Sequence, residues 1–515
     1  MRSRGSMFVL CLLFLTLFVL TASSFAIPAF SRQYGTSCTT CHIDFPKLND
    51  FGKAFKDAGF KFPKDDESFL KVPPVMLGAP AQKELWPHTV FPGTIPGLPP
   101  IGLRFNQFFQ YTPASANNYT PAGSTASPNV PRTDFEPGFF SIFMAGNFGS
   151  DIAFWVDDDL SVAGANANGG LGDGYLKFVN LGRFFKLPTD SLSLRIGQFE
   201  LDLPFTQARS INITPYDIYT EANIGSSQQN VNNVYEIQDA AQGFELSGGH
   251  QYGGYHYSVA FVNQNTSGTS TTAPNVSSPA GFFSDSNYKD FYGRFSYRFN
   301  LEKDPTSRHD IMAAGPSGPR DHTYLTLGTF YFKGRSVQRF NGVDASDNAT
   351  VITAREPFYR VGGDFSFNYR TLNVYGLYMY GHDDDLLCQD STGTAIACSS
   401  GIGTSFTNGG LAKFNGGFVE ADYLALPWVM TILRYDRVQS TADFLNQAGS
   451  VNYFSPAGAT RNRVTPGVQF LIHANIKASF EYAIRPQQAL SYNSNGQAVS
   501  PFRTSTATGA LEFVY

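Results

Sequence analysis

The chain is poor in cysteine, with only five among its 515 residues. One of these, Cys11, lies in an apolar run near the N-terminus, and the other four form two close pairs, Cys38 with Cys41 and Cys388 with Cys398. A zinc site at the first pair would need further Cys or His ligands nearby. None follow closely, so the scarcity argues against zinc. No convincing amphipathic helix occurs after about residue 101, which argues against a helical body.

The N-terminus has the order of a secretory signal peptide. Arg2 and Arg4 precede the apolar run at 7–20, and the small residues Ser24 and Ala26 follow it. This order predicts a signal peptide over residues 1–26. The alternative is an uncleaved anchor, but the run is short for a spanning helix, which needs ~20 residues. The mature chain is therefore expected outside the cytoplasm, where close cysteines pair, and a structural Cys388–Cys398 disulfide is predicted.

Cys38, Cys41 and His42 form the pattern C-x-x-C-H, which is typical of c-type haem attachment. The two thiols add to the haem vinyl groups, and the adjacent imidazole binds the iron as proximal ligand. A disulfide or a redox dithiol would not require His42. The pattern occurs once, so we predict one covalent haem c in an N-terminal haem domain over residues 27–62.

The stretch 44–63 predicts the helix of this small domain. Pro46 suits its first turn and Gly59 its C-terminal stop. An apolar stripe from Phe45 to Phe55 recurs every three to four residues, and it would pack against the haem or simply form a small core. The unit is too small to shield a haem alone, so another part of the chain must do so.

The second axial ligand has two candidates in the sequence, Met76 and His88. A methionine would raise the reduction potential relative to a second histidine. Both lie in the proline-rich stretch 63–100, which reads as a semi-rigid linker. Each could equally be an ordinary linker residue.

From residue 101 onward, segments of about ten residues alternate between polar and apolar side chains. In 291–299, for example, Phe295 and Tyr297 fall on one face, and Arg294 and Arg298 fall on the other. Abundant aromatics, the absence of long apolar runs after the signal, cationic inward faces and a terminal aromatic strand favour a membrane barrel over a soluble sandwich. The fold class expected is mainly β, a transmembrane barrel over 101–515 preceded by the helical haem domain.

The strand count supports a bacterial outer-membrane barrel, because such single chains have even numbers of strands. Connections after odd-numbered strands are mostly long and those after even-numbered strands mostly short, which places both termini in the periplasm. The acidic clusters 157–159 and 382–385 would then lie at the outer rim, where they could attract cations or simply be solvated. Sixteen strands are expected, near 101–112, 137–148, 151–158, 172–181, 190–200, 241–249, 253–263, 288–300, 321–333, 358–369, 371–381, 413–424, 427–438, 463–472, 474–484 and 506–515.

Residues 26–42, "AIPAFSRQYGTSCTTCH", are similar to a known family. This stretch resembles the start of the fused monohaem cytochrome c–porin family of outer-membrane iron oxidases, and 194–205 is similar to their barrel. The resemblance assigns haem binding to Cys38, Cys41 and His42. It implies an outer-membrane Fe(II):cytochrome c oxidoreductase, with Fe(II) or another donor outside and a periplasmic cytochrome or other carrier inside.

The leading interpretation is thus an electron conduit in the outer membrane, with its haem in the barrel lumen or at the periplasmic mouth. No catalytic residue is assigned, and no nucleic-acid partner is expected. The alternative is a diffusion porin with a haem-bearing plug or redox-gated lid. A third interpretation, a tethered haem sensor, would need an open iron position, which carbon monoxide binding would detect.

Overall fold

The structure of the chain is a computed structural model. It describes residues 29–62, 66–79, 81–90, 93–112, 132–135, 139–149, 151–161, 170–206, 209–220, 241–263, 288–302, 322–343, 349–389, 395–396, 405–440, 460–485, 491–492, 498–499 and 505–515. The predicted signal peptide at 1–26 lies outside these residues. No helix in the described ranges is both long and apolar enough to cross a membrane.

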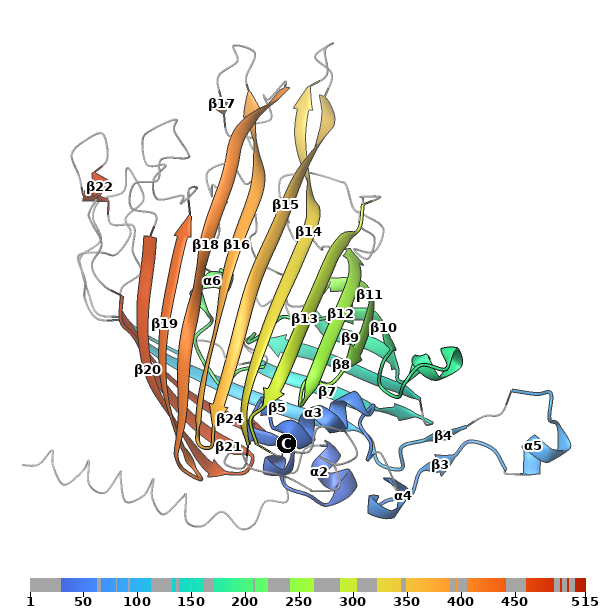
Figure 1. Cartoon of the computed structure of the whole chain (residues 1–515). Coiled ribbons are helices and arrows are strands. Elements are labelled where there is room, and N and C mark those ends of the chain that lie inside the picture. Colours follow the sequence, from blue (N-terminus) through green and yellow to red (C-terminus); the bar gives the residue numbers. More distant parts are fainter. Residues whose placement is uncertain are drawn as a thin grey trace, which may run out of the picture.

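Sixteen long antiparallel strands close into one barrel, as predicted from the alternation (Figure 1). The ring closes where β24 pairs with β5, and two short strands, β6 (Arg132–Asp134) and β17 (Ala395–Ile396), are inserted in it. The long strands are β5 (Ile101–Thr112), β7 (Phe139–Phe148), β8 (Ile152–Ser161), β9 (Gly170–Phe178), β10 (Ser193–Phe199), β11 (Ala241–Gly249), β12 (Gly254–Asn263), β13 (Asp290–Asn300), β14 (Thr323–Val343), β15 (Ala349–Tyr369), β16 (Leu372–Gln389), β18 (Ser405–Leu426), β19 (Val429–Ser440), β20 (Thr460–His473), β21 (Ile476–Ala483) and β24 (Thr506–Val514).

The two faces of the wall divide as the sequence predicts. In β13, Arg294, Ser296 and Arg298 point inward, while Phe295 and Tyr297 are exposed on the outside. The same alternation of inward polar and outward apolar residues holds along β21 and β24. An apolar outer band around a polar lumen is the organisation of outer-membrane porins, so the barrel is of that type.

The barrel wall is uneven in height. Strands β14, β15, β16 and β18 have 18 to 22 residues each, whereas β10 has 7. Figure 1 shows these long strands rising above the rest of the wall. The sequence predicted much shorter strands here. The expected outer loop at 382–412 is largely strand, because β16 and β18 continue to pair as far as Gln389 and Ser405.

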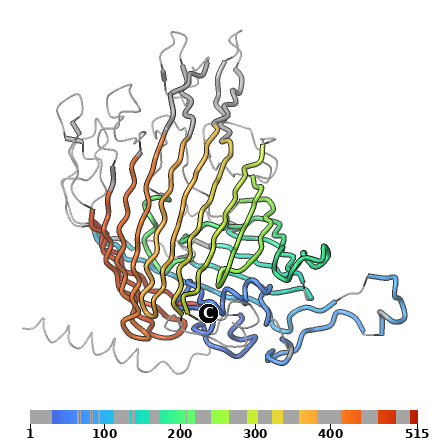
Figure 2. The backbone as a smooth tube through the Cα atoms, viewed as in Figure 1, coloured from blue at the N-terminus to red at the C-terminus, as the bar shows by residue number. Residues whose placement is uncertain are grey.

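The N-terminal residues 29–62, which we call the plug, lie at the barrel end that has the shortest turns (Figure 2). Connections of two residues at 370–371, 427–428 and 474–475 mark this end, which we assign to the periplasm. The C-terminus lies at the same end, where Tyr515 and Leu103 exchange backbone hydrogen bonds. The plug contains α2 (Ala29–Tyr34), η1 (Cys38–Thr40), β1 (His42–Asp44), β2 (Lys47–Leu48) and α3 (Asp50–Asp57).

Residues 66–100 do not form a plain extended linker. They make an arm that reaches sideways from the plug in Figure 1, with a two-stranded hairpin near its base. Its elements are α4 (Asp66–Phe69), β3 (Val75–Met76), α5 (Ala81–Leu85) and β4 (Thr94–Ile95). The remaining short elements among the described residues are η2 (Leu181–Phe185), α6 (Asp217–Thr220), β22 (Ser491–Tyr492) and β23 (Ala498–Val499).

The connection after β10 folds into the barrel, whereas the sequence predicted an outer loop. We call residues 200–206 and 209–220 the luminal segment; it ends in α6, which Figure 1 shows within the barrel. Leu201, Ile211, Tyr216 and Ile218 on it are almost fully buried. The prediction of an entirely outer loop at 201–240 is therefore wrong for its first half, because these apolar side chains bury against the inner wall. Residues 221–240 lie outside the described part.

Candidate functional site

The C-x-x-C-H motif sits on the N-terminus of helix α3. The Asn49 side chain caps this helix by accepting from the Gly52 amide at 2.8 Å, and it also donates to the Thr40 carbonyl at 3.0 Å. The helix thus begins at Asp50, not at Pro46 as predicted, because the cap is Asn49. A Cβ on Gly52 would lie 2.2 Å from the carbonyl oxygen of Cys41, so only glycine permits this close approach.

The C-terminal stop of α3 is the one predicted. Gly59 has φ +79°, and the Phe60 amide donates back to the Phe55 carbonyl at 3.0 Å, as in a Schellman motif. The apolar face of α3 packs on α2 through aromatic rings, with Phe30 and Phe55 centroids 5.1 Å apart. Phe51 and Phe55 of the predicted stripe are buried in this cluster.

The two thiols of the motif are free, and both are partly buried. Burial raises the pKa of Cys41 to about 12, and it also raises the pKa of Cys38. The thiols therefore stay protonated at neutral pH. Redox-active C-x-x-C dithiols have lowered thiol pKa values, which is the opposite direction from the shift of these two thiols.

The His42 imidazole has the arrangement expected of a metal ligand. Its Nδ1 lies 3.1 Å from the Pro46 carbonyl oxygen, which only accepts, so Nδ1 carries the proton. Metal-binding histidines usually donate their other ring N–H to such an acceptor. Burial lowers the pKa of His42 to about 4, which keeps the ring neutral and leaves the Nε2 lone pair available to iron.

A cavity of about 610 Å³ opens beside the motif inside the barrel. Its volume falls in the range of about 300–1,000 Å³ that is typical of ligand sites. Cys38, Cys41 and His42 all line it, together with aromatic rings of the plug that include Phe51, Phe55 and Phe62. Two free thiols, a neutral imidazole and an apolar wall on one cavity fit a covalently held haem.

Charged contacts fix the plug to four separate strands of the wall. One is a bidentate pair in which Arg298 donates twice to the Asp50 carboxylate at 2.8 Å, with both residues buried. Although burial alone raises it, the pKa of Asp50 is lowered to about 2 by Lys53 and Arg298. The other contacts are Lys47–Asp422 at 2.7 Å, Asp57–Lys177 at 3.8 Å, and Lys477 with the Phe45 carbonyl and, at 3.9 Å, with Asp44.

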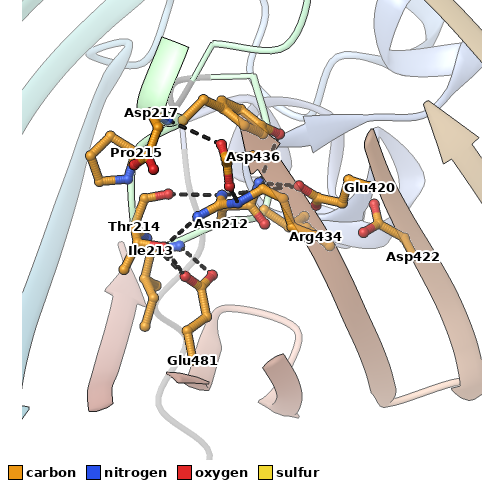
Figure 3. Close-up of polar contacts among 12 residues, drawn as sticks. Asn212, Ile213, Thr214, Pro215, Asp217, Glu420, Asp422, Arg434, Asp436 and Glu481 are labelled. Atoms are coloured by element: carbon orange, nitrogen blue, oxygen red, sulfur yellow. Dashed lines mark hydrogen bonds and ion pairs between the residues drawn. The ribbon is translucent and has the colours of Figure 1, made fainter. Parts of the chain in front are cut away.

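The luminal segment meets the same cavity from the other side, through residues that include Glu200, Asp202 and Phe205. Hydrogen bonds hold it to the far wall (Figure 3). Glu481 accepts from the Ile213 amide at 2.9 Å, and Asp436 accepts from the Asp217 amide at 3.0 Å. The cavity beside the motif is therefore bounded below by the plug and above by the luminal segment.

Neither distal-ligand candidate lines this cavity. Met76 lies in β3 and His88 follows α5, so both belong to the arm, and both are exposed to solvent. The cavity instead contains other imidazoles, His256 and His322. Sequence spacing after the motif indicated the arm. His256 lies in β12 and His322 immediately precedes β14, both far from the motif in the sequence, so no local signal pointed to them.

The sequence also predicted a disulfide and an acidic cluster at the outer rim. Cys398 and the side chain of Cys388 lie outside the described residues, so the disulfide stays a prediction. Asp157 was expected at the outer rim, but it lines the lumen cavity, where it accepts from the Asp173 amide at 2.5 Å. In the described ranges, no group of three or more His, Cys, Asp or Glu side chains is arranged to hold a metal ion.

Several solved structures have backbones similar to that of this chain. They include the channel DcaP of Acinetobacter baumannii (11% identity, 81% of this chain and 96% of that one, TM-score 0.43). The high-pH structure of Pseudomonas putida OprB (9%, 81% and 94%, 0.45) and Salmonella typhi OmpF in complex with daunomycin (10%, 81% and 97%, 0.41) are also similar. No family model and no curated protein matches the chain.

Proposed function

We propose that this protein is an outer-membrane electron conduit, with one haem c held by the plug inside a porin-type barrel. Cys38 and Cys41 would hold the haem by thioether bonds, and His42 would bind its iron. When bound, the haem supplies a one-electron Fe(III)/Fe(II) couple. The observation that carries the proposal is the single cavity that both thiols and the neutral His42 ring line together.

The chain's own residues supply shelter, which the small plug cannot supply alone. Aromatic rings of α2, α3 and 60–62 cover one side, and Phe60 also meets Trp155 of the wall, with ring centroids 5.8 Å apart. The luminal segment covers the side toward the outer half. An electron carrier needs insulation and access but no reaction pocket, so a sheltered cavity inside the membrane wall suits this role.

The donor and acceptor follow from the family resemblance. Electrons would come from Fe(II) or another extracellular donor and leave to a periplasmic cytochrome or similar carrier, which would make the protein an Fe(II):cytochrome c oxidoreductase. The plug lies at the end assigned to the periplasm, which favours direct contact with such a carrier.

A diffusion porin with a haem-bearing plug is the second candidate. Barrels of sixteen strands leave an aqueous channel unless something fills them, and the lumen wall here is polar. Two features weigh against it: the luminal segment crosses the lumen, and ion pairs from β9, β13, β18 and β21 hold the plug. A gated lid would have to break these pairs together.

Two measurements on the full chain separate the candidates. In proteoliposomes with the outer face exposed, stopped-flow absorbance should show rapid haem reduction by added Fe(II), and planar bilayers should show little solute conductance. A wide, steady current would favour the porin. If Fe(II) leaves the haem oxidised while another donor reduces it, the iron assignment fails but the conduit survives.

A further inference from the structure

A second cavity, of about 550 Å³, lies at the plug end of the barrel, on the outer surface. It forms where the β9–β10 and β11–β12 connections meet the end of β13. Tyr255, Tyr297 and Phe299 line it and are 41–46% exposed. They face away from the lumen, because their neighbours His256 and Ser296 are buried and line the lumen cavity.

The three rings form one aromatic wall. Tyr255 and Tyr297 are direct cross-strand partners, and the rings of Tyr297 and Phe299 are 4.6 Å apart. The wall continues outward along the same strands into the lipid-facing residues Phe261 and Phe295. Aromatic rings at this level are typical of the membrane–water interface, so the cavity opens where phospholipid headgroups lie.

The other side chains of the cavity are polar: Thr189, Asp190, His250, Arg298, Asn300 and Glu302. The charge of Arg298 is paired with Asp50 of the plug, so Asp190 and Glu302 supply the carboxylates of the cavity. Glu302, which is exposed, follows β13 and accepts from the Thr323 hydroxyl at 2.8 Å through one of its oxygens. Asp190 comes from the β9–β10 connection, and its backbone carbonyl accepts from the Gly249 amide at 2.9 Å. No residue that the structure describes forms an ion pair with Glu302. Aromatic faces beside carboxylates are the surroundings that recognise an organic ammonium group.

The neighbouring connection shows a second membrane feature. It spans residues 179–192, whereas three other connections at this end have only two residues. Its helix η2 leaves Phe184 and Phe185 70% and 69% exposed, between the cationic Arg183 and Lys186. Exposed aromatics flanked by basic residues are typical of segments that lie at a phospholipid surface.

We propose that this cavity binds the ammonium headgroup of an inner-leaflet phospholipid. The ammonium would rest against the aromatic wall and beside Glu302, while the acyl chains continue along Phe261 and Phe295. The continuity of the aromatic wall with the lipid-facing band favours a phospholipid over a small soluble amine. The site does not depend on the haem or on electron transfer.

The test is native mass spectrometry of the detergent-solubilised full chain, titrated with phosphatidylethanolamine or phosphatidylglycerol. We expect selective retention of phosphatidylethanolamine, and about a five- to tenfold loss in Glu302→Gln and in Tyr297→Ala. The matched control is Tyr331→Ala, which removes an outward, exposed ring of β14 away from the cavity and should change nothing. Glu302→Gln is an exposed, isosteric change, so a folding defect would not explain its effect.

Three outcomes would overturn the proposal. Equal retention of the two lipids would reduce the cavity to ordinary annular contact. Unchanged retention in both variants would place any selective site elsewhere. Displacement of the phospholipid by millimolar free ethanolamine would make the site one for small amines.

Discussion

Replacing Arg298 with methionine should release the plug from the barrel wall. The side chain donates two 2.8 Å hydrogen bonds to Asp50, and its guanidinium also lies 3.6 Å from the Tyr324 ring centroid. Removing it would leave the Asp50 carboxylate buried, with Lys53 at 3.4 Å as its remaining cation. An uncompensated buried charge is the main cost of the substitution.

Two magnitudes bound the effect. Breaking a buried ion pair costs about 3–5 kcal/mol. The fall in the pKa of Asp50 from 3.8 to about 2 corresponds to about 2.4 kcal/mol, at ~1.36 kcal/mol per pH unit. Because Lys53 shares in that fall, we take a range of about 2–5 kcal/mol for undocking. This range equals a shift of roughly 30- to 4,000-fold in the docking equilibrium.

Hydrogen exchange monitored by mass spectrometry, on peptides covering α3, measures this shift in the docking equilibrium directly. Amides that exchange only after undocking should lose protection by that factor in Arg298→Met, and Arg298→Lys should recover part of it. The control is Arg370→Met, which removes an exposed cation in the two-residue turn at the same end of the barrel. Protection that stays within about threefold of wild type in Arg298→Met would show that the Arg298–Asp50 pair does not hold the plug to the wall.

Three further predictions concern the plug and the lumen. Gly52→Ala should lower haem incorporation, measured as haem per chain, because its Cβ would clash with the Cys41 carbonyl at a cost of about 1–3 kcal/mol; Gly363→Ala, which has room, should not. The pKa of Asp50 is lowered, so its contribution to the docking free energy of the plug is full above about pH 4 and is lost as pH falls toward 2. Hydrogen exchange of the α3 amides should therefore accelerate between pH 4 and 2, and it should accelerate less in Asp50→Asn. Asp217→Asn should raise planar-bilayer conductance, because Asp217 pairs with Arg463 and Arg485 and anchors the luminal segment; equal conductance in Asp217→Asn and the rim control Asp151→Asn would contradict this.

Alternation was enough to find all sixteen long strands, since each must present one face to lipid and one to the lumen. The bounds of β11, for example, were predicted without error. Strand length was not predictable for β14, β15, β16 and β18, because their outer ends extend beyond the parts with a clear alternation. The luminal segment was missed for another reason. Its apolar residues have the same local pattern as those of a strand or a core, and the wall against which they bury is distant in sequence.

The motif residues were predictable because C-x-x-C-H is a local pattern, and the structure brings all three to one cavity. The cavity's other walls were not predictable. Arg298 and Asp422 contact the plug from strands that lie 248 and 375 residues beyond their partners Asp50 and Lys47. The luminal segment is also distant from the plug in sequence, and no local signal pairs any of these parts. The same limit applies to a second axial ligand, for which spacing pointed to the arm while the structure gathers other histidines around the cavity.

The most direct test of the central claim is the haem content of the purified full chain. A pyridine haemochrome assay and a haem-stained denaturing gel should find one covalent haem per chain, and Cys38→Ala/Cys41→Ala should lose it while the barrel still folds in detergent. A chain that is secreted and folded in a host competent for c-type haem attachment, yet shows no haem absorbance, would contradict it.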